Sequence, residues 1–175
     1  STSEASSESP IIQTCVDRKI NLGVISSTLS EGHSVSEDFG GILQRLDRSI
    51  FDVSYHYLHE KSNPTDSAAF MSANPSDKLY HYFKQDTDIN DGAWVRRHGQ
   101  EIEKFEFDMI LYLDLTMGTQ VRRLGMERLA PVQLNTHGHP VTSGIPRDTV
   151  QHFVSWAEAE LPLEESQTHY TEELQ

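Results

Sequence analysis

A loop rich in glycine, histidine and hydroxyl side chains follows a strand-like stretch in the last third of the chain. Val132 to His137 alternates apolar and polar side chains as a short strand does. The next residues, Gly138 to Gly144, read Gly-His-Pro-Val-Thr-Ser-Gly and cannot continue the strand, because glycine and proline favour turns. Glycine lets the backbone come close to a ligand, and Thr142 and Ser143 offer hydroxyls to it. A binding loop is one interpretation of this composition, and an ordinary surface loop is the other.

Side chains suited to proton transfer come directly after two apolar runs. His33 lies in the loop after the first run, and Asp114 and Thr116 end a later one. A histidine titrates near neutral pH, and a carboxylate or the phenol of Tyr112 could compete with it for the same work. His33 and Asp114 are therefore the candidate catalytic residues. The alternative for His33 is a structural one, in which it caps the helix that begins at Ser34.

The strands and helices that must position these residues alternate along the chain. Near-continuous apolar runs predict strands buried on both faces, and apolar side chains three or four positions apart predict helices. Ser34 is the expected N-cap of the first helix, with Glu37 completing a capping box. The predicted strands are 19–27, 51–58, 78–83, 107–115, 132–137 and 151–156, of which 78–83 could also be helical, and the predicted helices are 34–48, 91–104, 117–129 and 162–174.

This alternation predicts an α/β domain of three layers with a mostly parallel, doubly wound sheet in strand order 3-2-1-4-5-6. In such sheets ligands bind beyond the carboxyl ends of the strands, near the point where the strand order reverses. We therefore expect a crevice between the first and fourth strands. His33, Asp114, Thr116 and His139 should converge at that edge.

Composition limits the possible binding partners of the protein and its possible cellular compartment. The 27 acidic residues outnumber the 14 basic ones and leave a formal charge of −13, which argues against binding to nucleic acid or to an anionic membrane surface. Cys15 is the single cysteine, so an internal disulfide is excluded and a reducing compartment is favoured. No run approaches the ~18 apolar residues of a membrane-spanning helix, and no leader sequence is seen. We expect a cytoplasmic or nuclear protein.

Two pairs of histidines look like partial metal sites. One pair is His137 and His139, and the other is His56 and His59. Neither pair is completed by further ligands at the spacing that zinc sites show, so we expect no metal.

The order of residues around the glycine-rich loop resembles a signature of the O-GlcNAc transferase family and its bacterial relatives. Leu129-Ala-Pro-Val-Gln133 resembles the Ala-Pro-x-Gln strand start of that family, and Gly138 to Gly144 resembles its Gly-(Tyr/His)-Pro-x-Thr-Ser-Gly loop. The similarity runs from about Lys19 to Leu174 and is tightest from Asp108 to Gly144. Members of the family are inverting glycosyltransferases of the two-domain GT-B type, in which each half is a Rossmann-like domain.

The resemblance implies that this chain is the N-terminal, acceptor-side half of such an enzyme. Residues 1–12 would be a disordered serine-rich tail, 13–160 the Rossmann-like half, and 161–175 a terminal helix leading toward a missing second half. The enzyme would transfer a sugar, with GlcNAc as the first expectation, from a nucleotide donor such as UDP-GlcNAc to serine or threonine hydroxyls of a protein or peptide. No cofactor is implied. Without the second Rossmann-like domain, which holds most of the nucleotide, the segment should be inactive.

The resemblance also assigns roles to residues. His33 is similar to a family histidine beside the donor phosphates that has been proposed as a base. Bacterial-type relatives often read His-Ser-Val at this point, as the chain does, whereas another branch reads His-Pro-Thr. The identity of the transferred sugar is therefore left open. His139, between Gly138 and Pro140, should have a fixed, shape-giving role. The expected substrate-binding residues are Ser34, Thr116, Gly138, His139, Pro140, Thr142 and Ser143. The alternative is a non-catalytic interaction module that keeps the fold.

Overall fold

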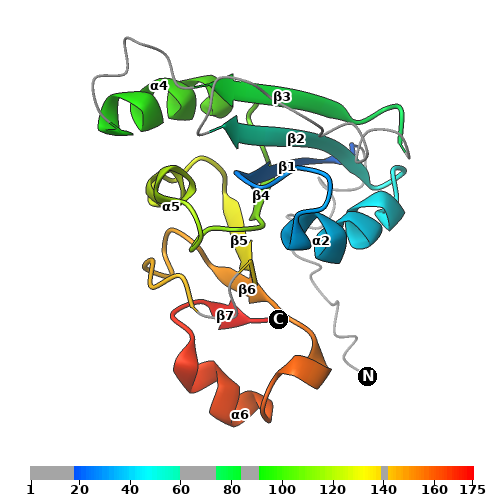
Figure 1. Ribbon diagram of the computed structural model, residues 1–175. Helices are drawn as coiled ribbons and strands as arrows, with labels where there is room; N and C mark the ends of the chain where they lie inside the picture. Colours follow the sequence, from blue (N-terminus) through cyan, green and yellow to red (C-terminus); the bar gives the residue numbers. More distant parts are fainter. Residues whose placement is uncertain (1–17, 60–73, 84–90, 139–141) are drawn as a thin grey trace, which may run out of the picture.

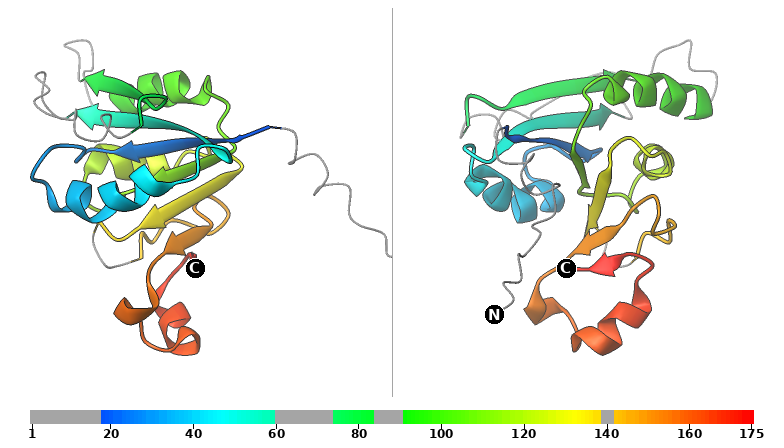
Figure 2. Two further views of the ribbon diagram at one scale, coloured as in Figure 1. Left: turned by 90° about the vertical axis from the view of Figure 1, so that its right-hand side faces the viewer. Right: turned by 180° about the vertical axis from the view of Figure 1, so that it is seen from behind.

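The computed structural model describes residues 18–59, 74–83, 91–138 and 142–175. Within these ranges the chain forms one sheet of seven strands, in the order β3-β2-β1-β4-β5-β6-β7. All neighbouring strands are parallel (Figures 1 and 2). The strands are β1 (Ile20–Ser26), β2 (Phe51–His59), β3 (Lys78–Phe83), β4 (Met109–Tyr112), β5 (Val132–Thr136), β6 (His152–Val154) and β7 (Glu173–Leu174). The helices are α2 (Ser34–Arg45), α4 (Asp91–Glu103), α5 (Thr119–Gly125) and α6 (Leu163–Ser166), with short 3-10 helices at Ala157–Ala159 and Gln167–His169.

The predicted fold class and strand order are confirmed. The order begins 3-2-1-4-5-6 as expected, the stretch 78–83 is a strand, and β7 extends the sheet by one strand. Helix α2 covers one face of the sheet, and α4 and α5 cover the other (Figure 1). The domain therefore has the three layers of a Rossmann-like α/β fold.

Two apolar cores lie on the two faces of the central strand β1. Val24 packs on one face with Phe39 and Leu43 of α2, and Ile25 packs on the other with the helices α4 and α5. Both β1 side chains are completely buried. A strand enclosed on both faces needs apolar residues at consecutive positions, which explains the continuous apolar run in this part of the sequence.

The C-terminal segment differs from the predicted helix that was to run from Pro162 to Leu174. Helix α6 begins directly after Pro162 but covers only Leu163–Ser166, and Glu173–Leu174 is the edge strand β7, paired with β6. Burial alternates along this strand: Glu173 is exposed and Leu174 is buried. Tertiary pairing with β6 therefore outweighs the helix propensity of these residues. The segment 161–175 is not a terminal helix, and its last strand is part of the same sheet.

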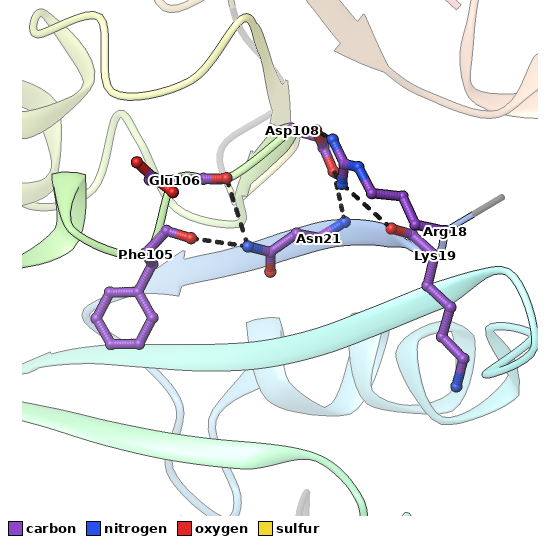
Figure 3. A network of polar contacts seen from close by, with 6 residues as sticks. All are labelled: Arg18, Lys19, Asn21, Phe105, Glu106 and Asp108. Atoms are coloured by element: carbon purple, nitrogen blue, oxygen red, sulfur yellow. Dashed lines mark hydrogen bonds and ion pairs between the residues drawn. The ribbon is translucent and has the colours of Figure 1, made fainter. Parts of the chain in front are cut away.

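A polar network clamps the amino-terminal end of β1 to the chain just before β4 (Figure 3). The Arg18 guanidinium donates to both carboxylate oxygens of Asp108 at 2.6 Å, and Asn21 N donates to Asp108 Oδ2 at 2.9 Å. Asn21 Nδ2 donates to the carbonyl of Phe105 at 2.8 Å. The hydrogen bonds from Arg18 hold the pKa of Asp108 below its usual value. The network fixes the position of β1 along β4.

A buried histidine lies on β2. His56 is fully buried, its Nδ1 lies 2.7 Å from Tyr82 OH, and its Nε2 lies 3.0 Å from Ser54 Oγ. The rings of Phe105 and Phe107 meet it edge-on. Burial lowers the pKa of His56 to about 3, because the charged imidazolium cannot be solvated there.

This burial predicts that the protein loses stability in weak acid. The unfolded imidazole takes up a proton near its usual pKa of 6.5, whereas the folded one does so only near pH 3, so unfolding takes up a proton in between. His56 should then lower the free energy of unfolding, as pH falls through this window, by up to about 1.4 kcal/mol per pH unit. Urea unfolding at a series of pH values measures how the free energy of unfolding depends on pH. This dependence should be shallower for His56→Phe than for the unmodified protein. Identical slopes for the two proteins would contradict the prediction.

Candidate functional site

The carboxyl edge of the sheet carries His33, Asp114 and Gly138, three of the residues that the sequence singled out. The strands all point the same way, so the segments that leave β1, β4 and β5 emerge side by side (Figure 2, left). The loop after β1 leads to His33 at the start of α2, β4 leads to Asp114, and β5 leads to Gly138. The strand order reverses between β1 and β4, which is where open α/β sheets bind ligands.

Asp114 is a completely buried carboxyl group that joins the ends of β4 and β1. Its Oδ2 accepts hydrogen bonds from Ser27 N at 2.9 Å and from Ser27 Oγ at 2.6 Å. Its other oxygen, Oδ1, is buried and has no hydrogen-bond partner in the described part of the chain. Burial raises the pKa of Asp114, although the hydrogen bonds from Ser27 act in the opposite direction. An unpaired buried oxygen is costly, and a donor from a ligand would remove that cost.

The first glycine of the loop is required by close packing. A Cβ at Gly138 would lie 2.6 Å from the carbonyl oxygen of Leu113 and 2.7 Å from the Cα of Asp114. Any side chain at this position would push the loop away from Asp114. The loop therefore starts in direct contact with the backbone of the candidate catalytic carboxyl. His139 and Pro140 lie outside the described residues, so their predicted roles stay predictions.

His33, not Ser34, is the N-cap of α2, so the predicted capping box is wrong by one residue. His33 has extended backbone angles, φ −88° and ψ 131°, and its Nδ1 accepts a hydrogen bond from Val35 N at 3.3 Å. Its carbonyl accepts from Glu37 N at 3.0 Å. Ser34 is exposed and is the first residue of the helix. An imidazole side chain can fill the capping role of a serine because an unprotonated ring nitrogen is also an acceptor.

The capping bond fixes the chemistry that His33 can offer. Since Nδ1 accepts from Val35 N, a neutral imidazole must carry its proton on Nε2. His33 is then a hydrogen-bond donor at Nε2 in its neutral form. The first turn of α2 is tied to the loop after β1 by Ser36 Oγ, which donates to the carbonyl of Thr28 at 2.7 Å.

The hydroxyls of Thr142 and Ser143 are used inside the protein. Thr142 Oγ1 donates to Glu172 Oε2 at 2.7 Å, and Ser143 N donates to Glu172 Oε1 at 2.9 Å. Ser143 Oγ donates to the same oxygen. Arg122 Nη1 donates to the carbonyl of Ser143 at 2.6 Å. These bonds give the two residues a role in shaping the loop, and direct contacts from them to a substrate stay a prediction.

Glu172 is a completely buried carboxylate that sequence reasoning missed. Burial acts to raise its pKa, but the hydrogen bonds from Ser143 and Thr142 outweigh burial and hold that pKa below its usual value. In the sequence Glu172 is one glutamate in an acidic tail, and no local pattern distinguishes it from its neighbours. Ser27, which holds Asp114, was also missed as a site residue, although its position directly after an apolar run was a usable signal.

The remaining predicted residues are placed as follows. Thr116 lies half-buried in the turn between Asp114 and α5. His59 Nε2 lies 2.7 Å from His81 Nδ1, so it pairs with a histidine of β3 and forms no site with His56. Across the residues that the structure describes, no three histidine, cysteine, aspartate or glutamate side chains are grouped to hold a metal ion. Nor is any helix in these ranges both long and apolar enough to span a membrane.

Comparisons with known proteins bear on the fold. No family model matches the chain, and no curated protein sequence matches it. Among solved structures, a mutant of the O-GlcNAc transferase of Thermobaculum terrenum is similar, with a TM-score of 0.67 and 20% sequence identity. The similarity covers 90% of this chain and 27% of that chain, so this chain spans about a quarter of the length of its structural neighbour.

At this identity the likeness shows the fold alone. The seven-stranded parallel sheet and its helices form a Rossmann-like α/β domain, consistent with one half of a GT-B fold. The structural neighbour is a glycosyltransferase, and the resemblance seen in the sequence is thus matched at the level of the fold.

Glu172 gives a test of what holds the loop in place. Glu172→Ala should lower the free energy of unfolding by about 3 kcal/mol, because it leaves the buried N–H and hydroxyl donors of Ser143 unpaired. The matched control is Glu173→Ala, whose half-exposed carboxylate pairs with Arg147 at 2.9 Å and should contribute less than about 1 kcal/mol. Urea unfolding of the two variants measures the difference. Equal losses would show that Glu172 is no special anchor.

Proposed function

We propose that this chain is the acceptor-side half of a nucleotide-sugar-dependent inverting protein O-glycosyltransferase, with GlcNAc as the sugar and serine or threonine hydroxyls as acceptors. The observation that carries the proposal is the buried Asp114, whose Oδ1 is unpaired beside the strand-order reversal. It lies on a fold shared with an O-GlcNAc transferase. The donor would be a nucleotide sugar such as UDP-GlcNAc, and a second Rossmann-like domain would complete the cleft and the activity.

The reaction would use the charged groups and hydrogen-bond donors at the carboxyl edge of the sheet. The acceptor oxygen forms the new bond to the anomeric carbon, the bond from that carbon to the diphosphate breaks, and the acceptor loses its proton. A raised pKa suits Asp114 to hold that proton. His33, whose Nδ1 is engaged as the cap, would donate a hydrogen bond from Nε2 to the leaving diphosphate, assisted by the N-terminal dipole of α2. This role differs from the base that the family resemblance suggested for His33.

A non-catalytic interaction module is the second candidate. The observation that favours it is that several expected ligand-binding groups already have partners within the chain. The hydroxyls of Thr142 and Ser143 bond to Glu172, and Nδ1 of His33 caps α2. A module of this kind would keep the fold and bind a partner without transferring a sugar.

Two variants of His33 separate a chemical role from capping. Asparagine is a good N-cap, so His33→Asn keeps the helix start and removes the imidazole, whereas His33→Ala removes both at a stability cost of about 1 kcal/mol. In the enzyme that contains both Rossmann-like halves, each variant should lower turnover of GlcNAc transfer from UDP-GlcNAc at least about 100-fold. His139→Tyr should have a much smaller effect, since the resembling family often has tyrosine there. Steady-state kinetics with a serine-containing peptide measures all three.

The outcomes of this comparison are distinct. Full turnover in His33→Asn would reduce His33 to a cap. A larger loss in His139→Tyr than in His33→Ala would move the working histidine to position 139.

Binding of nucleotide to these 175 residues alone tests which half of the proposed enzyme holds the nucleotide. One wall of a two-walled cleft should bind UDP or UDP-GlcNAc with a dissociation constant of about 1 mM or weaker, equivalent to about −4 kcal/mol. Isothermal titration calorimetry measures this directly. Micromolar binding would place the nucleotide site within this chain and overturn the acceptor-side assignment.

A further inference from the structure

A cavity of about 390 Å³ lies beyond the carboxyl ends of β5 and β6, under the segment that carries α6. That segment forms the lower end of the molecule in Figure 1. The cavity is lined on one side by His137 and Thr142, which follow β5, and on the other by Trp156, Glu160 and Tyr170. The volume is within the range of sites that hold a small ligand or a large side chain.

Aromatic rings form much of the wall. Trp156 is 47% exposed, although large aromatic side chains are usually more buried, and its ring meets that of His137 edge-on at 3.9 Å. Tyr170 packs on the buried ring of Phe153 at 4.6 Å and is held in place by it. The other tryptophan that the structure describes, Trp94, is only 2% exposed and lies in the core.

A fixed carboxylate faces the same space. Ser155 Oγ donates to Glu160 Oε1 at 2.7 Å, and Tyr170 OH donates to the same oxygen at 2.9 Å. The hydrogen bond from Ser155 is the main cause of a lowered pKa of Glu160, so this group is charged at neutral pH. Burial lowers the pKa of His137, which keeps its imidazole neutral there.

The segment that carries α6 is acidic. From Ser155 to Gln175 the sequence holds six glutamates and neither lysine nor arginine. The described side chains that line the cavity likewise include no lysine or arginine. A negative potential in a partly enclosed space attracts cations and repels anions such as phosphates.

We propose that this cavity binds an arginine side chain presented by a polypeptide partner. A flat guanidinium stacks on an indole ring and donates hydrogen bonds to a carboxylate. Trp156 supplies the ring and Glu160 the carboxylate, whose Oε1 already accepts from Ser155 and Tyr170, so the guanidinium would donate to Oε2. An apolar ligand would leave Glu160 without a counter-charge, and a neutral sugar would do the same. The inference goes beyond the proposed function, because it holds whether or not the chain takes part in sugar transfer.

Titration of the isotopically labelled chain with N-acetyl-arginine N-methylamide tests the proposal by NMR. The indole N–H resonance of Trp156 should shift with the ligand, whereas that of the buried Trp94 should stay in place as an internal reference. The citrulline analogue has the same shape without the charge and should cause no saturable shift. Added salt should weaken binding, because the attraction is electrostatic.

Two glutamate variants form a matched pair for the same titration. Glu160→Gln keeps an oxygen that can accept from Ser155 and Tyr170, and it should weaken arginine binding at least about tenfold, or 1.4 kcal/mol. Glu164→Gln removes the same charge from an exposed position of α6 outside the cavity, and it should change binding less than about twofold. Unchanged spectra with the arginine probe would overturn the proposal. So would equal effects of the two variants, or a Trp156 shift caused by free GlcNAc and not by arginine.

Discussion

The parallel pairing of β1 with β4 is the constraint on which the candidate site depends. The two strands are about ninety residues apart in the chain and run in register from Leu22 opposite Met109 to Ile25 opposite Tyr112. An aspartate flanks β4 at each end, and each one holds β1. Asp108 bonds Arg18 and Asn21 at the amino end, and Asp114 bonds Ser27 at the carboxyl end. The strand order reverses at this pair, so the same pairing places Asp114 at the edge where sheets of this kind bind ligands.

The two aspartates show how the same type of side chain takes different roles in different surroundings. Asp108 is partly exposed, and a hydrogen bond from Arg18 lowers its pKa, so it acts as a charged clamp whose net contribution to stability is modest. Asp114 is enclosed, faces no cation among its described partners, and has a raised pKa. Burying such a group is costly to the fold, and costs of this kind are concentrated at functional sites.

The glycine-rich loop links the candidate site to the cavity that carries the second proposal. Gly138 packs on the backbone beside Asp114, and Thr142 lines the cavity with Trp156 and Glu160. Glu172, just before the edge strand β7, holds the far end of the loop. A residue next to the outermost strand thus anchors a loop that begins after β5. A partner bound in the cavity would contact the same loop that borders Asp114.

The sequence by itself determined the strands and helices up to β6, the order of these strands in the sheet and the edge at which His33, Asp114 and Gly138 lie. Buried parallel strands need continuous apolar runs, and crossover connections have one hand, so local patterns suffice for these features. Only the tertiary structure decided the partners. His33 replaces Ser34 as the cap, 173–174 pairs with β6 as a strand, and Glu172 is the one glutamate of the tail that is buried beneath a loop. The last two outcomes depend on contacts between residues far apart in the chain, and such contacts leave no local pattern in the sequence. The cap is a local contact, which the sequence offered only as an alternative role for His33.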